Sequence, residues 1–476
     1  MRIRTLFLII SLGLSALPLR ATGIAQSKQA NSDASLAAIR SQDRLARNSK
    51  GTITRLTAEE HLRRASIYHV NRAFEEAREH WQALINYYPE DPRVAEALLG
   101  IGRSYFQGRR YYESYNAYDR LARLYPATKE GRQGLNFSAA ALLRMGKTSE
   151  AADRYIDYIN RYPDGERIET AHLNAIDTLR EAGRLQDASS WIARTRQRFA
   201  GTPTDSNALF GQLRMEISEG NWKRAAAAAD ELSRKASQKG VATSPAEVAY
   251  LKAYSLDRAG NRDEAISAYL AVPGGIDSYY GWLATERLSN IAGSRQRSLV
   301  TERSDRNTSQ ATAVASQYPA PYGRAILSTA KARKLDPRFI LALIKQESVF
   351  RPTAKSPAGA RGLLQLTMDA AQKYAANAGM QPVQESQLYQ PETSIRLGSE
   401  YLAELSAMFP NLPEAVAASY NGGEDNVARW VKRAKQKDPG VFTSEVGFDE
   451  TKAYVQKVMN NYRIYKQLYN ADLTRQ

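Results

Sequence analysis

The sequence of 476 residues contains no cysteine. This absence excludes disulfide bonds, cysteine-ligated zinc, a thiol nucleophile and the modified cysteine that anchors lipoproteins. Histidine is scarce too, and it occurs only at His61, His69, His80 and His172. Because no histidine lies beyond residue 172, we expect neither a histidine-based metal site nor a Ser-His triad in the C-terminal half. The sequence therefore predicts a protein without a metal site and without a cofactor.

Acidic residues are outnumbered, since 66 Lys and Arg stand against 50 Asp and Glu, a net charge of +16. The basic excess is spread along the chain rather than packed into one tract. A basic surface suits any polyanion, whether nucleic acid, anionic lipid or an acidic cell-wall polymer. Because no basic-aromatic nucleic-acid motif is present, we expect no nucleic-acid partner.

Long apolar runs are also missing, apart from one at the N-terminus. Two arginines precede the apolar run Thr5–Leu19, and the small residues Gly23-Ile24-Ala25 follow it. The run is too short for a comfortable membrane span, and this pattern is typical of a secretory signal. We expect residues 1–25 to be a signal peptide and the protein to be exported. The alternative is an uncleaved membrane anchor, against which Arg20 at the end of the run argues.

A repeat of 37 residues follows a polar segment, 26–55, which is predicted to be a flexible linker. The repeated positions are the aromatics Tyr88, Tyr125, Tyr162 and Phe199, the glycines Gly146, Gly183 and Gly220, the small residues Ala77, Ser114, Ala151, Ala188 and Ala225, and the aromatics Trp81, Tyr118 and Tyr155. This spacing predicts helix-turn-helix units in which glycine ends the first helix and the small residue lets two helices approach. The pattern resembles tetratricopeptide-type repeats.

The repeat domain is predicted to span residues 56–288 and to offer a concave surface to envelope proteins or glycan strands. The alternative is that its aromatic residues only fill the core. Its last segment, Ser278–Leu288, contains the letters Y-G-W-L-A. Residues 289–317, rich in Ser, Thr, Arg and Gln, are predicted to be a second linker.

Glu347 is the candidate catalytic residue. It lies near the end of a predicted helix that begins with Asp336 as N-cap and Pro337 as first helical residue. Ile340 and Ile344 share its helical face, so the carboxyl group should be poorly solvated and suited to act as a general acid near neutral pH. The alternative is a solvated glutamate that pairs with Arg351.

Several motifs follow Glu347 in a fixed order. They read Q-E-S at 346–348, S-P-A-G-A-R-G-L-L-Q at 356–365, P-E-T-S-I-R-L-G at 391–398, S-Y-N-G-G at 419–423 and E-T-K-A-Y-V at 450–455. This ordered set resembles the catalytic domain of soluble lytic murein transglycosylases, relatives of goose-type lysozyme, over residues 318–476. The Y-G-W-L-A letters resemble the segment that closes the helical region of larger members. Leu364, Ser394 and Gly422 depart from the family pattern, which has Met, Asn and Ala there.

The resemblance implies that a single glutamate, Glu347, protonates the glycosidic oxygen and later takes a proton from the C6 hydroxyl, closing a 1,6-anhydro ring. It also implies that the glycan is contacted by Ser356, Gln365, Tyr420, Asn421, Glu450 and Tyr454. Gly359 and Gly362 would allow tight turns and a close approach of the backbone to a sugar.

We therefore expect a predominantly all-α protein, in which a superhelical repeat domain precedes a lysozyme-like domain with a small β-hairpin or loop region. The expected function is that of an exported, periplasmic peptidoglycan lytic transglycosylase, membrane-associated only if the signal is uncleaved. One alternative is a lysozyme-like muramidase that uses water. The other is an envelope scaffold whose lyase domain is inactive.

Overall fold

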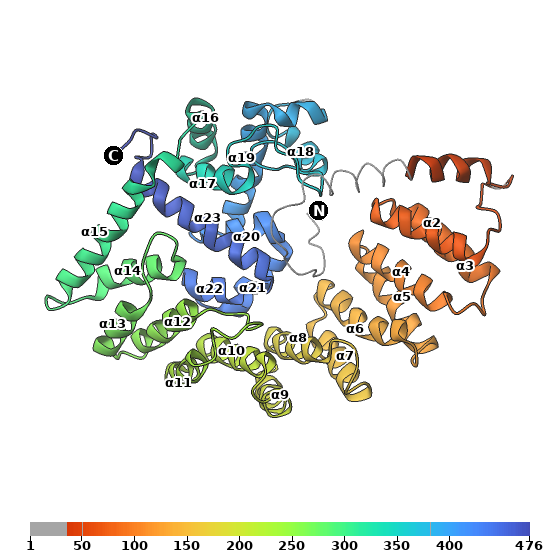
Figure 1. The fold of residues 1–476 in the computed structure, drawn as a ribbon, viewed down its shortest axis with the longest axis horizontal. Coiled ribbons are helices and arrows are strands. Elements are labelled where there is room, and N and C mark those ends of the chain that lie inside the picture. Colours follow the sequence, from red (N-terminus) through yellow and green to blue (C-terminus); the bar gives the residue numbers. More distant parts are fainter. Residues whose placement is uncertain (1–35, 50, 381) are drawn as a thin grey trace. The chain divides into compact units, whose positions relative to one another are not determined.

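The computed structural model describes residues 36–49, 51–380 and 382–476, and these residues form helices joined by turns and loops (Figure 1). No strand occurs among them, so the all-α class is confirmed. The expected β-hairpin is reduced to isolated bridges, which join Lys355 to Arg361 and Arg361 to Leu366. The proposed signal peptide lies outside the described residues. Within the described ranges the chain divides into two compact units, 36–200 and 201–476.

The first unit consists of helices in which each packs against the next. They are α2 (Ala58–Val70), α3 (Phe74–Tyr87), α4 (Val94–Gln107), α5 (Tyr111–Leu124), α6 (Lys129–Arg144), α7 (Thr148–Arg161), α8 (Ile168–Glu181) and α9 (Leu185–Arg198). Thr57 caps α2 by accepting a hydrogen bond from the Glu60 N–H. Gly146 and Gly183 follow the ends of α6 and α8 at φ values of 77° and 76°. This left-handed backbone is what glycine adopts freely, so the predicted helix ends are confirmed.

The small and aromatic repeat positions lie in the core of this unit. Ala77, Ala151 and Ala188 are fully buried, and Trp81 and Tyr118 are buried beside them. A small side chain at the helix contact lets the backbones approach, and the larger rings fill the space on either side. These aromatic residues are therefore core residues.

Two segments expected to be linkers contain helices. Residues 36–45 are helical, and Ile39 and Asp43 on this helix are buried. In the second segment α15 (Arg297–Ala313) buries Val300, and the Arg303 guanidinium donates to the carbonyl oxygens of Leu270 and Val272. Both helices are polar in sequence because few of their side chains face the protein, which hides the helical pattern of apolar residues.

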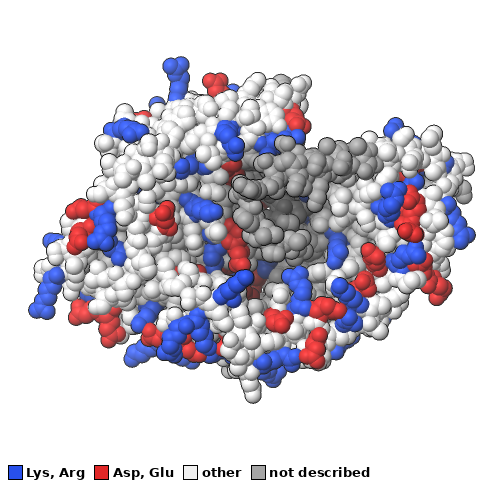
Figure 2. All heavy atoms as spheres, in the orientation of Figure 1, with Lys and Arg blue, Asp and Glu red and all other residues white. Residues whose placement is uncertain are grey.

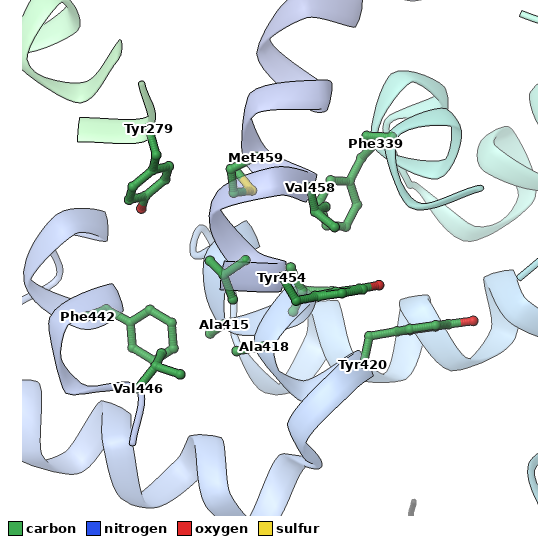
Figure 3. Packing of buried hydrophobic residues seen from close by; sticks show 14 of the residues in the cluster. Tyr279, Phe339, Ala415, Ala418, Tyr420, Phe442, Val446, Tyr454, Val458 and Met459 are labelled. Carbon is green, nitrogen blue, oxygen red and sulfur yellow. The ribbon is translucent and has the colours of Figure 1, made fainter. Parts of the chain in front are cut away.

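The second unit contains the remaining helices. They are α10 (Pro203–Ser218), α11 (Trp222–Ser233), α12 (Pro245–Arg258), α13 (Arg262–Ala271), α14 (Tyr279–Ile291), α15, α16 (Gly323–Arg333), α17 (Pro337–Ser348), α18 (Met368–Ala375), α19 (Pro391–Met408), α20 (Pro413–Gly422), α21 (Glu424–Ala434), α22 (Pro439–Glu445) and α23 (Asp449–Leu468), with short 3-10 helices at Ala315–Gln317 and Glu385–Tyr389. The C-terminal helix α23 packs against α17 and α20 on one side and against α14 and α15 on another. Figure 3 shows this arrangement: Tyr279 and Phe442 lie on one side of α23, and Phe339 lies on the other.

Basic and acidic side chains are interspersed on the visible surface (Figure 2), in keeping with a basic excess that is spread along the sequence. None of the helices in the described ranges has the length and apolar character needed to cross a membrane. Those ranges also hold no group of three or more His, Asp or Glu side chains placed to bind a metal ion.

Candidate active site

Glu347 lies in the last turn of α17. The Asp336 side chain caps this helix by accepting from the Arg338 N–H at 2.9 Å. Ile340 and Ile344, on the same helical face as Glu347, are fully buried. The carboxyl group therefore lies at the edge of the apolar core, where water is scarce, as the sequence predicted. Arg351 does not pair with it, because its guanidinium donates to the Ser348 carbonyl oxygen instead.

Burial raises the pKa of Glu347 to about 7. One hydrogen bond acts in the opposite direction: the Tyr454 hydroxyl on α23 donates to Glu347 Oε1 at 2.5 Å and lowers the pKa. The cause of the net shift is loss of hydration, which disfavours the charged carboxylate. A carboxyl group with a pKa near 7 can both donate and accept a proton at neutral pH, which is what general acid-base catalysis requires.

The glycine-rich segment after α17 forms tight turns. Gly359 and Gly362 have φ values of 79° and 77°, and a Cβ atom on Gly362 would lie 2.0 Å from the Leu388 carbonyl oxygen. Only glycine fits there. Gln365 also has positive φ, at 47°, and its amide donates to the carbonyl oxygens of Ala354 and Gly362 at 3.1 and 2.9 Å. The Gln365 side chain thus holds this turn together. Ser356 Oγ, in the same segment, accepts from the Ala360 N–H.

Tyr420 connects α20 to this turn. Its buried hydroxyl donates to the Leu364 carbonyl oxygen at 2.6 Å. Its ring stacks on Tyr401 from α19, with ring centres 5.1 Å apart, and Tyr401 stacks in turn on Tyr374. The rings of Tyr420 and Tyr454 project side by side, with their hydroxyl groups on the same side (Figure 3). Two tyrosine hydroxyls are therefore fixed beside the acid, one on Glu347 and one on the Gly362–Gln365 turn.

Asn421 and Glu450 occupy the edge of this region. Asn421 Oδ1 accepts from the Thr451 hydroxyl at 2.6 Å, which ties the end of α20 to the first turn of α23. Glu450, in that first turn, is exposed to solvent. It lies four residues before Tyr454 and so shares its helical face.

The structure thus brings Glu347, Tyr454 and Tyr420 together and places Gln365 on a turn that Tyr420 holds. Ser356 and Gly359 lie earlier in the same glycine-rich segment, and Glu450 is exposed to solvent. The sequence analysis assigned no role in the site to Tyr401, whose ring supports Tyr420, or to Thr451, which holds Asn421. Thr451 stands inside the motif E-T-K-A-Y-V, so its position was a usable signal. Tyr401 stands three residues after the motif P-E-T-S-I-R-L-G and belongs to the same ordered set, but the sequence does not show that its ring stacks on Tyr420.

The fold and the site define an all-α protein with a weakly hydrated acid at the edge of the core, next to a turn rich in glycine. Residues 324–442 match the family model of the Transglycosylase SLT domain, and residues 62–127 match that of a Tetratricopeptide repeat. The chain therefore combines a transglycosylase SLT domain with tetratricopeptide repeats. Glu450 and Tyr454 lie beyond the matched SLT segment.

Relatives with similar sequences are named soluble lytic murein transglycosylases. A protein of Haemophilus influenzae, named as a candidate soluble lytic murein transglycosylase, is 34% identical over 157 residues, which are 33% of this chain and 26% of that protein. The soluble lytic murein transglycosylase of Escherichia coli K12 is 30% identical over 159 residues, 33% of this chain and 24% of that protein. The matches thus span about a quarter of the length of these relatives.

Among solved structures, an inactive mutant of the lytic transglycosylase Slt from Pseudomonas aeruginosa aligns with a TM-score of 0.45 and 20% sequence identity. That alignment covers 86% of each chain.

Proposed function

We propose that the protein is an exported peptidoglycan lytic transglycosylase. In this proposal it cleaves the β-1,4 bond between N-acetylmuramic acid and N-acetylglucosamine and leaves a 1,6-anhydromuramoyl end. Glu347 serves as the single general acid and base. The observation that carries the proposal is the weakly hydrated Glu347 carboxyl group, with a pKa of about 7, inside an SLT domain.

The electrostatic surroundings of Glu347 support a single-acid mechanism. Glycosidases that use water or a protein nucleophile normally hold a second carboxylate close to the first. Among the described residues, the groups that shift the pKa of Glu347 include Tyr454 and no second carboxylate. The proton cycle then runs through Glu347 alone: its neutral form protonates the leaving oxygen, and the resulting carboxylate accepts the C6 hydroxyl proton as that oxygen closes the ring. Bond formation to C6 oxygen replaces attack by water.

The neighbouring residues have separate roles in this proposal. Tyr454 orients the Glu347 carboxyl group, since its hydroxyl donates to Oε1. Gln365 and Ser356 line the glycan path on the glycine-rich segment, where Gly359 and Gly362 keep the backbone close to the sugar. Tyr420 and Asn421 hold that path in place, and Glu450 contacts the glycan from the solvent side. The repeats are proposed to hold envelope proteins or glycan strands.

The test is mass spectrometry of the fragments that the purified protein releases from peptidoglycan. We expect fragments that end in 1,6-anhydro-N-acetylmuramic acid, and a rate that falls by at least about 1000-fold in E347Q, as expected for loss of the acid. Above pH 7 the rate should fall as pH rises, because Glu347 must be protonated to donate.

E450Q is the matched control, because it makes the same chemical change in the solvent-exposed carboxylate. We expect E450Q to weaken binding while the anhydro product persists. Fragments with reducing ends would show hydrolysis and contradict the proposal. If the folded wild-type protein released no fragments at all, the reading as an envelope scaffold with an inactive domain would replace it.

A further inference from the structure

Helix α23, which carries Tyr454, packs against helices that precede the SLT domain in the chain. In the second unit, α10 and α12 pack against α21 or α22, and α14 and α15 pack against α23. In Figure 3, Tyr279 of α14 lies across α23 from Tyr454. The position of Tyr454 relative to Glu347 therefore depends on how these helices hold α23.

One buried ion pair holds the first turn of α23. Lys452 Nζ lies 3.1 Å from Glu247 Oε1 of α12 and donates to the Ala242 carbonyl oxygen at 3.2 Å. The Glu247 side chain is 1% exposed and that of Lys452 is 10% exposed. The ammonium group also lies 5.0 Å from the centre of the Phe210 ring on α10. A buried pair of this kind is sensitive to the loss of one partner, because the remaining charge is left without compensation.

The same turn of α23 reaches into the site. Thr451, next to Lys452, donates to Asn421, and Tyr454, two residues further on, donates to Glu347. The 2.5 Å contact between Tyr454 and Glu347 tolerates little displacement of this turn, because a hydrogen bond weakens steeply as it lengthens or bends.

We propose that Glu247 is a positioning residue for the active site. Through Lys452 it fixes the first turn of α23, and so keeps the Tyr454 hydroxyl on the Glu347 carboxyl group. This inference rests on the proposed role of Glu347 as the acid. It makes the helices before the SLT domain part of the catalytic apparatus, beyond any role in holding a partner.

A neighbouring contact provides a matched control. The Tyr250 hydroxyl, on the same helix α12, donates to Asp438 at 2.9 Å. Asp438 is the N-cap of α22 and has no part in the first turn of α23. Y250F therefore removes another polar contact between α12 and the C-terminal region, and it leaves the first turn of α23 unchanged.

The experiment compares E247Q and Y250F in the full chain, with cleavage of defined glycan oligomers measured from pH 5 to pH 9. We expect E247Q to lower kcat about tenfold with less than a twofold change in KM, the pattern of a misplaced catalytic group. The alkaline limb of the pH profile should move to higher pH, because the Tyr454 hydrogen bond lowers the pKa of Glu347 and is weakened. Y250F should leave both the limb and kcat unchanged.

Two double variants test whether the effect passes through Lys452 and Tyr454. In a Y454F background, E247Q should cause no further shift in the alkaline limb of the pH-rate profile. E247Q/K452M, which removes both buried charges, should recover at least half of the lost kcat. Equal effects of E247Q and Y250F, or a full extra shift on top of Y454F, would overturn the inference and leave Glu247 a merely structural residue.

A measurement without substrate separates this inference from the proposed function. The difference in Tm between a variant and its E347Q derivative, followed against pH, reports the pKa of Glu347 directly. If the wild type cleaved no glycan but E247Q still moved this pH dependence and Y250F did not, the positioning role would stand while the proposed function fell. If E247Q left it unmoved, the positioning role would fall regardless of activity.

Discussion

Two carboxyl groups, one in each unit, each accept a hydrogen bond from a tyrosine, and yet their pKa values are shifted in opposite directions. In the first unit the Tyr68 hydroxyl donates to Asp43 at 2.6 Å, and in the second the Tyr454 hydroxyl donates to Glu347 at 2.5 Å. Burial raises the pKa of both. The pKa of Asp43 nevertheless lies below its usual value, whereas that of Glu347 is raised to about 7.

The difference comes from the other neighbours. Asp43 also pairs with the Arg64 guanidinium and accepts from His80 Nε2 at 2.9 Å. The histidine tautomer follows from a chain of bonds, since the Leu56 N–H donates to His61 Nε2 and His61 Nδ1 then donates to His80 Nδ1. Glu347 receives one neutral donor and no cation among the groups that shift its pKa. A hydrogen bond from one tyrosine does not keep the pKa of a buried carboxyl group low; at Asp43 the additional donors His80 and Arg64 do so.

The largest effect that would test this contrast is expected from D43N. The amide removes the buried partner of Arg64, which keeps only its pair with the partly exposed Glu60, and it presents an N–H to other donors. We therefore expect a loss of about 3 kcal/mol in the stability of the first unit at pH 7. Hydrogen exchange of α2 and α3 measures it. Because the pKa of Asp43 is lowered in the folded state, its contribution is present above about pH 4 and disappears as the pH falls through the folded pKa. Unchanged protection at pH 7 would show that Asp43 is not a structural ion.

E347Q, the corresponding change in the site, should stabilise the fold, whereas D43N should destabilise it. The folded-state pKa of Glu347 is about 7 against an ordinary value of 4.5, so ionisation destabilises the fold increasingly between pH 4.5 and pH 7. The full difference corresponds to about 3 kcal/mol, and since the side chain keeps part of its surface accessible we expect a gain of about 1–3 kcal/mol at pH 8. Chemical denaturation should show no gain at pH 4, and a constant difference across this range would refute the raised pKa.

The smallest effect concerns two buried tyrosine hydroxyls of the second unit. Y420F removes the hydrogen bond to the Leu364 carbonyl oxygen and should cost about 1 kcal/mol, with a higher KM because the Gln365 turn loosens. Tyr269 is the matched control, because its hydroxyl has no hydrogen-bond partner among the described residues. Thermal unfolding should therefore show no loss for Y269F. Equal losses in the two variants would mean that the Tyr420 hydroxyl does not hold the turn.

The sequence predicted what depends on periodicity and on local motifs. The spacing of Gly146 and Gly183 located helix ends, and the apolar face around Glu347 indicated its weak hydration. Asp43 stayed hidden because it lies in a polar segment whose helix shows little apolar pattern. The pair of Glu247 and Lys452 stayed hidden because the residues are far apart in the chain, and neither has a distinctive local context. Long-range charge pairs follow from packing, which no local pattern encodes.

The pKa of Glu347 also determines which molecules could block the site. A neutral carboxylic acid offers little attraction to a positively charged inhibitor, whereas its carboxylate attracts one strongly. Amine-bearing sugar mimics should therefore bind more tightly as the pH rises through about 7, until the amine itself loses its proton. Uncharged sugar analogues should lack this dependence, so inhibitors of the two kinds would rank differently on either side of neutrality.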